Sequence, residues 1–177
     1  MQVPPSARPA GPKTEQIILF RISGVLFAMS SASVQEVRSV ESLSGTSQEL
    51  PQSAVRKARH ALRRGDRTFY LVNGTIHFGL PQAPASLVFL LRHTKTALLV
   101  DGIEKMTSIS RLQALSHAFC HEERRWYRGL AALDQTVVPV VNPDGFLSFE
   151  EQTLLDEALA ASHAERATPT AGEDSPA

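Results

Sequence analysis

The stretch that decides the fold is residues 125–161, which read RWYRGLAALDQTVVPVVNPDGFLSFEEQTLLDEALAA. Residues 126–133 are mostly apolar, the polar pair Asp134-Gln135 interrupts them, and residues 136–141 are rich in β-branched side chains. Two such runs on either side of a two-residue polar break predict a β-hairpin.

A turn and a helix are predicted directly after this hairpin. Pro143 fixes its φ angle and Gly145 accepts positive φ, which together favour a turn. Ser148 and Glu151 have the spacing of a capping box, and one apolar stripe follows it, formed by Leu154, Leu155, Ala158 and Leu159. Because each buried leucine stabilises by roughly 1.5–3 kcal/mol, we expect this helix, residues 148–163, to dock on the rest of the chain.

The preceding chain reads as short strands separated by turns. Strands are predicted at 16–22, 25–29, 68–72, 75–80, 86–91 and 96–100, and Asn73-Gly74 is the strongest hairpin signal. Such spacing favours a mainly β barrel or sandwich over alternating βαβ units. A hairpin, a helical turn and a second hairpin occur at 16–80 and again at 86–141, so we predict two similar small barrels packed together.

Helical segments are predicted between these strands. Ser33 and Glu36 form a second capping-box pair, which predicts a helical turn at 34–37, and a similar turn is expected at 101–106. Residues 51–64 have a helical pattern that Gly65 ends, and Ser110 can cap a short helix that reaches Phe119.

The whole chain has 177 residues and a formal net charge of zero. No apolar run approaches the length of a membrane span, and the single cysteine, Cys120, favours a reducing, cytoplasmic setting. Four prolines predict a disordered arm at 1–14, and an acidic composition predicts a disordered tail at 164–177. The folded part is then 15–163, with a first barrel at about 16–81, a second at about 86–147 and the helix at 148–163.

Catalytic chemistry is not predicted. No phosphate-binding glycine loop or nucleophile motif is present. His117 and His121 are four residues apart beside Cys120, a spacing that can hold a metal, but no second pair of ligands accompanies them. We therefore expect no enzyme activity, no metal and no cofactor.

A basic stretch leaves two interpretations open, a solvated face or a docking surface for an acidic partner. It contains Arg56, Lys57, Arg59, Arg63, Arg64 and Arg67, whereas the chain from Asp144 onward is strongly acidic. The alternative function that follows is a nucleic-acid-binding small-barrel protein that uses a basic helix at 53–64. No aromatic residue interleaves the arginines, which disfavours stacking on single strands.

The chain resembles CheW, the family of bacterial chemotaxis coupling proteins. The resemblance covers about residues 16–161 and rests on residues at family spacing: Gly129-Leu130, Ala132-Leu133, the apolar run 137–141, Asn142, Glu150-Glu151, Leu154-Leu155-Asp156 and Val34-Gln35-Glu36-Val37. It implies two five-stranded barrels and a non-enzymatic cytoplasmic adaptor, monomeric in isolation. Such an adaptor is recruited to membrane-associated receptor arrays, where it couples chemoreceptor helices to a CheA-type histidine kinase. No nucleic acid is expected.

The resemblance also implies partner-binding positions. Those that match the family by position are Val34, Glu36, Val37, Gly74, Val100, Asp101, Arg128 and Gly129. The family's usual arginine is replaced by Asn73 in the first barrel, so we add Asn73, and also Arg59 and Arg63, because the basic stretch can supply the lost charge. A hydrophobic groove near the barrel junction is expected to hold the receptor helices.

Overall fold

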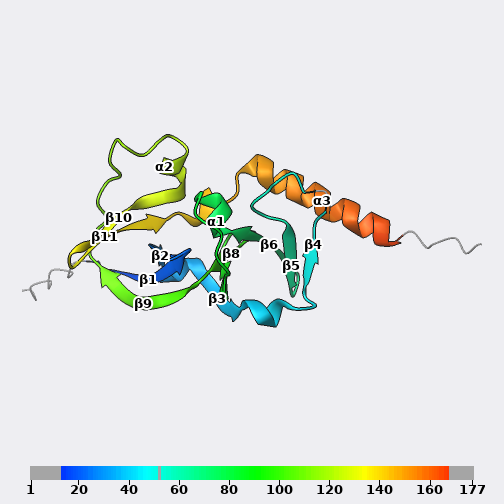
Figure 1. Cartoon of the computed structure of the whole chain (residues 1–177), viewed down its shortest axis with the longest axis horizontal. Helices are drawn as coiled ribbons and strands as arrows, with labels where there is room; N and C mark the ends of the chain where they lie inside the picture. The colour runs from blue at the N-terminus through cyan, green and yellow to red at the C-terminus, as the bar shows by residue number, and fades with distance from the viewer. Residues whose placement is uncertain (1–12, 52, 168–177) are drawn as a thin grey trace, which may run out of the picture.

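The computed structural model describes residues 13–51 and 53–167, and these residues form two β-sheets with a long C-terminal helix (Figure 1). The strands are β1 Glu15–Ile22, β2 Val25–Ser30, β3 Val34–Ser39, β4 Ser47–Glu49, β5 His60–Arg64, β6 Arg67–Asn73, β7 Leu87–Leu91, β8 Thr96–Val100, β9 Gly102–Ile109, β10 Tyr127–Leu133 and β11 Thr136–Val141. The helices are α1 Gly74–His77, α2 Glu123–Trp126 and α3 Phe149–Ala167, with 3-10 turns η1 Ser31–Ser33, η2 Val40–Leu43 and η3 Pro143–Gly145. The prediction of a mainly β protein with a C-terminal helix is confirmed.

The two sheets divide the chain differently from the predicted barrels. One sheet has the order β10-β11-β2-β1-β9, and the other has the order β3-β7-β8-β6-β5-β4. The first sheet therefore joins the two ends of the β region, and the second holds its middle. The predicted division into strands of 16–81 and strands of 86–147 is wrong, because β1 pairs with β9 and β6 pairs with β8 across that boundary.

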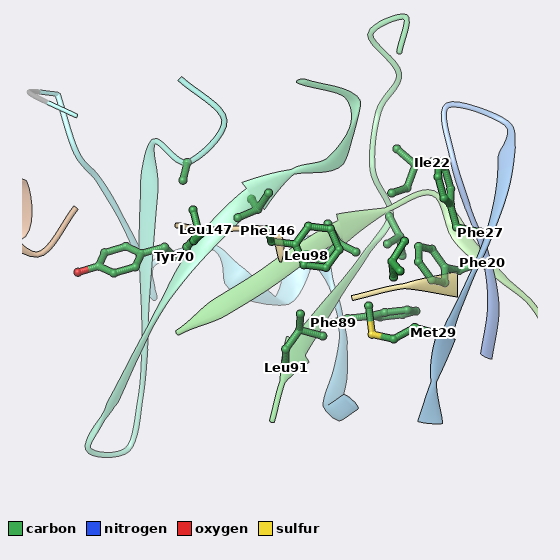
Figure 2. Close-up of a cluster of buried hydrophobic side chains, with 14 of the residues drawn as sticks. Phe20, Ile22, Phe27, Met29, Tyr70, Phe89, Leu91, Leu98, Phe146 and Leu147 are labelled. Atoms are coloured by element: carbon green, nitrogen blue, oxygen red, sulfur yellow. The ribbon is translucent and has the colours of Figure 1, made fainter. Parts of the chain in front are cut away.

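A shared core holds the two sheets together. Phe20, Phe27 and Met29 of the first sheet pack with Phe89 and Leu98 of the second in one buried cluster. Figure 2 shows this cluster running from Phe20 and Met29 at one end to Tyr70 and Leu147 at the other. Each sheet also has a buried cluster of its own on its other face, around Leu19 and Val140 in the first and around Phe69 and Val88 in the second.

The C-terminal unit forms largely as the sequence predicts. β10 and β11 pair as a hairpin with Leu133 opposite Thr136, and Ser148 and Glu151 exchange hydrogen bonds of 2.9 and 3.1 Å in a capping box. The apolar stripe of α3 differs in one residue: Leu155 is fully buried, whereas Leu154 is 43% exposed. The helix also continues to Ala167, so residues 164–167, predicted to belong to a disordered tail, are helical.

Several predicted helices are strands or irregular segments. Residues 34–37 and 101–106 lie largely in β3 and β9, residues 60–64 form β5 instead of the end of a basic helix, and residues 110–119 form no helix. The capping-box signal at Ser33 failed because β3 pairs along its length with β7, and tertiary pairing outweighs a local helix signal of about 1 kcal/mol.

The predicted hairpin at Asn73-Gly74 is also wrong. β6 already has β5 on one side and β8 on the other, so no edge remains for residues 75–80. Asn73 instead accepts a hydrogen bond of 3.0 Å from the Thr75 amide and begins α1. The actual hairpin turn is Gly65-Asp66, where Gly65 has a φ of +62°.

Two predicted tails lie mostly outside the described residues. The disordered-arm prediction for residues 1–12 and the disordered-tail prediction for residues 168–177 concern parts of the chain that the structure does not describe. Residues 13 and 14 lead into β1.

Candidate partner-binding surface

Exposed apolar side chains lie where the two sheets meet. Val37 on β3 is 41% exposed, Ile103 on β9 is 44% exposed and Met106 on β9 is 59% exposed. β3 and β9 are each the terminal strand of their sheet. We call Val37, Ile103 and Met106 the seam surface.

The pairing of the strands places the seam surface beside the shared core. Val37 lies opposite Phe89 in the β3–β7 ladder, and Ile103 lies opposite Phe20 in the β9–β1 ladder. The rings of Phe20 and Phe89 contact each other edge to face, with centroids 5.3 Å apart. Since directly paired residues point to the same face of a sheet, Val37 and Ile103 flank this buried contact from the two sheets.

Charged residues border the seam surface on β3. Arg64 donates two hydrogen bonds to the Glu36 carboxylate, at 3.2 and 3.3 Å, and Arg38 lies 3.9 Å from it. Arg67 donates to the Gln35 side chain and, at 3.0 Å, to the Thr94 carbonyl. The tip of the β5–β6 hairpin therefore reaches β3, and Glu36 is neutralised by an arginine of the basic stretch.

The structure places the other predicted partner-binding residues in two groups. Arg59 and Arg63 are exposed, and Val34 is partly buried against the shared core. Val100 and Gly74 are buried, and a Cβ at Gly74 would lie 2.6 Å from Ile22 Cδ1. Gly74 therefore lets α1 approach β1 closely, and its position supports a role in packing.

Asp101, Arg128, Asn73 and Gly129 have structural partners within the chain. Asp101 accepts a hydrogen bond of 2.9 Å from the Gly24 amide in the β1–β2 turn. Arg128 pairs with Glu15 at 2.6 and 3.1 Å, and this guanidinium holds the pKa of Glu15 below its usual range. A Cβ at Gly129 would lie 2.7 Å from the Gln113 carbonyl oxygen. These four positions hold local structure within the chain.

The acidic helix α3 neutralises part of the basic stretch. Lys57 lies 2.9 Å from Glu151, and Lys95 lies 2.8 Å from Asp156. Burial acts to raise the pKa of Asp156, but hydrogen bonds from Lys95 and from the Tyr70 hydroxyl outweigh burial and lower it. Burial and the same carboxylate raise the pKa of Tyr70. These two ion pairs supplement the burial of Leu155, which docks α3 on the second sheet.

His77 is a buried histidine in the segment 75–80, which the sequence predicts as a strand and the structure places partly in α1. It is 6% exposed, and it lies on α1 among the rings of Phe78, Trp126 and Phe146. Its Nε2 atom has no hydrogen-bond partner among the described residues. Burial, with a smaller effect from the nearby Lys57 charge, lowers the pKa of His77 to about 3.

We expect His77 to make the protein sensitive to acid. Its ordinary pKa is 6.5 and its folded value is about 3, so between these values the unfolded chain binds a proton that the folded chain does not. The free energy of unfolding should therefore fall by roughly 1.4 kcal/mol for each pH unit below about 6.5. His77→Phe should remove this slope and keep or raise stability at pH 7. The measurement is urea unfolding at several pH values, with exposed His117→Phe as the control. An unchanged slope in His77→Phe would contradict the assignment.

Metal ligands do not gather in the part of the chain that the structure describes. Within residues 13–51 and 53–167, no three His, Cys, Asp or Glu side chains lie close enough together to hold a metal. Cys120 is exposed, and its amide donates a hydrogen bond of 2.8 Å to Glu123. The same described residues contain no helix with the length and apolar character that crossing a bilayer requires.

Sequence reasoning missed Ile103 and Met106. The sequence predicts a helical turn at 101–106, whereas the bulge at Glu104 puts Ile103 and Met106, three positions apart, on one face of β9. The available signal was the run Gly102–Ile109, in which apolar residues recur among polar ones and which follows a strand directly. Recognising it required knowing that β9 pairs with β1, more than eighty residues earlier in the chain.

Comparisons with known proteins agree with this architecture. A family model described as the CheW-like domain matches residues 16–151. Among solved structures, the scaffolding protein TtCheW from Thermoanaerobacter tengcongensis is similar, with a TM-score of 0.63 and 13% sequence identity, over 73% of this chain and 90% of that chain. At this identity the likeness concerns the fold alone. A search of curated proteins found no match. Because the family model covers most of its length, this chain belongs to the CheW-like domain family.

Proposed function

We propose that this protein is a non-enzymatic scaffold that couples chemoreceptors to a CheA-type histidine kinase in a chemotaxis-like signalling pathway. It acts in the cytoplasm and is recruited to membrane-associated receptor arrays. Its family membership supports an adaptor role, and the observation that carries the proposal is the seam surface between the two sheets. Exposed apolar side chains beside a rigid core suit an apolar stripe on a partner helix.

The position of Glu36 supports a partner interface that differs in detail from the family's usual one. The family's arginine is absent because Asn73 occupies its position and begins α1. Arg64, from the neighbouring hairpin, brings a guanidinium to Glu36 instead. We infer that this internal ion pair leaves little net charge beside the seam surface, so that the partner contact there is mainly apolar.

The alternative function, nucleic-acid binding, loses its structural basis. It rested on a basic helix at 53–64, but residues 60–64 form a strand. Lys57 and Arg64 also pair with carboxylates within the chain. Two of the basic side chains are therefore neutralised within the chain, which weakens the salt-dependent binding that a basic helix would give.

The seam surface gives the direct test of the proposal. Val37→Asp with Ile103→Asp should weaken binding of a chemoreceptor cytoplasmic fragment by about 2 kcal/mol or more, because charges would replace apolar contacts at the centre of the interface. Both side chains are about 40% exposed or more, so the fold should persist. Isothermal titration with the purified receptor fragment and kinase measures the effect. Val137→Asp is the control, since Val137 is 56% exposed on β11, away from the seam. Equal binding by both variants would refute the seam as the docking site.

Arg59 and Arg63 provide a separate test of the basic stretch. Both are exposed, and neither forms an ion pair with a carboxylate among the described residues. Arg59→Glu with Arg63→Glu should therefore weaken kinase or receptor binding while changing stability by only about 0.5 kcal/mol or less. The same titration and a thermal melt measure the two effects. Unchanged affinity would remove these arginines from the interface.

A further inference from the structure

The outer edge of β9 is unpaired in the described structure. β9 is the last strand of its sheet and pairs with β1 on one side only, and in Figure 1 it lies at the margin of the molecule. The other terminal strands are shorter or covered. β4 has three residues, β10 forms a bridge with Gln113, and the side chains of Arg64 and Arg67 reach β3. β9 thus offers eight residues of open edge.

Two features of β9 restrict how another strand can pair with it. The ladder with β1 shifts register between Leu19 and Phe20, so Glu104 forms a bulge. Bulges and lysines on an edge normally oppose pairing with further strands. The bulge leaves residues 105–109 as the regular part of the edge, because they pair without interruption with β1.

We propose that this regular edge pairs with the same edge of a second copy of the chain. The two β9 strands run antiparallel, and the twofold axis passes through Thr107. Thr107 then lies opposite Thr107 of the second copy, Met106 lies opposite Ser108 of the second copy, and Lys105 lies opposite Ile109 of the second copy.

The register follows from the geometry of the strand. In an antiparallel pair of identical regular strands, paired side chains share a face only if the axis passes through a residue. Thr107 is the centre of the five regular residues. The register places no like charges opposite each other, and Thr–Thr is a favourable cross-strand pair. It also makes the two Met106 side chains, each 59% exposed, diagonal neighbours across the two strands, where long side chains can contact each other.

The charge of the molecule suits association of identical chains. The formal net charge is zero at pH 7, so no long-range repulsion opposes contact between copies. An edge of five residues buries much less than the roughly 1,200 Å² of a stable interface, so the dimer is weak and the chain is monomeric in dilute solution. Given the proposed function, dimerisation also competes with the receptor, because it covers Met106 of the seam surface.

The test is sedimentation equilibrium of the whole purified chain over a wide concentration range, without kinase or receptor. We expect a reversible monomer–dimer equilibrium that Met106→Lys weakens about tenfold or more, because both copies then bring an added lysine to the edge. Val137→Lys, an equally exposed change on β11, should leave the dimer unchanged. In a Cys120→Ser background, Thr107→Cys should form a disulfide dimer on oxidation, and Lys105→Cys should not.

Three results would overturn this inference. They are a monomer at every concentration reached, a dimer that Met106→Lys does not weaken, and disulfide dimers that form equally with both cysteine variants. Because neither receptor nor kinase is present, such a failure would leave the proposed coupling role untouched. Loss of receptor binding in the seam variants would conversely say nothing about the dimer.

Discussion

Phe20→Ala should lower the free energy of unfolding by roughly 3–5 kcal/mol, the cost of removing a fully buried aromatic side chain. Phe20 is 0% exposed, and its ring contacts Phe27 within its own sheet and Phe89 in the other. The cavity would therefore open at the contact between the two sheets (Figure 2). Urea unfolding followed by circular dichroism measures the change.

The outcome also reports whether the sheets fold together. Because the shared core contains residues of both sheets, Phe20→Ala should shift one cooperative transition and should not produce two. Val25→Ala, in the strand paired with β1, is the control, because Val25 is 42% exposed and should cost about 0.5 kcal/mol or less. A loss below about 1 kcal/mol for Phe20→Ala, or separate transitions for the two sheets, would show that the shared core does not couple them.

Leu155→Ala should destabilise the protein by roughly 2–5 kcal/mol and loosen α3. Leu155 is fully buried in the shared core and holds α3 against the second sheet. Once it is lost, the Lys95–Asp156 pair is too solvent-exposed to hold the helix, since exposed pairs contribute about 1 kcal/mol or less. The partly buried Lys57–Glu151 pair holds only the first turn of α3. Thermal denaturation and amide hydrogen exchange along α3 measure the two effects.

Leu154→Ala provides a closely matched control. It makes the same chemical change one residue earlier in the same helix, where the side chain is 43% exposed. The change in helix propensity is the same, so a difference between the variants reports packing alone. We expect a cost of about 0.5 kcal/mol or less and unchanged exchange. Equal costs for the two variants would mean that α3 does not dock through Leu155.

Local signals predicted well where the interacting residues are close in the sequence. The β10–β11 hairpin, the turn that contains Pro143 and the capping box of Ser148 with Glu151 all involve residues within a few positions of one another. In each case the backbone groups or side chains that interact are brought together by the turn or helix itself. The family resemblance drawn from this same stretch is confirmed by the match over residues 16–151.

Local signals failed where a strand's neighbours come from distant residues. Asn73-Gly74 is a strong hairpin sequence, but both edges of β6 are occupied by β5 and β8, so the chain leaves the sheet there and forms α1. The capping-box pair at Ser33 and Glu36 likewise predicted a helical turn that does not form, because β7 pairs with that segment and makes it a strand. The basic pattern of 51–64 has the charges of a surface helix, and only the pairing of β5 with β6 reveals a strand.

The sequence by itself determined the class of the protein: a mainly β chain with a docked C-terminal helix and the residues that identify its family. The tertiary structure alone decided which strands share a sheet, and thereby placed Val37 and Ile103 on either side of the Phe20–Phe89 contact. It also brought Arg64 to Glu36 and left the outer edge of β9 open. The physical reason is that strand pairing depends on backbone hydrogen bonds, which carry no side-chain code, so partners far apart in the chain are selected by the packing of the whole core.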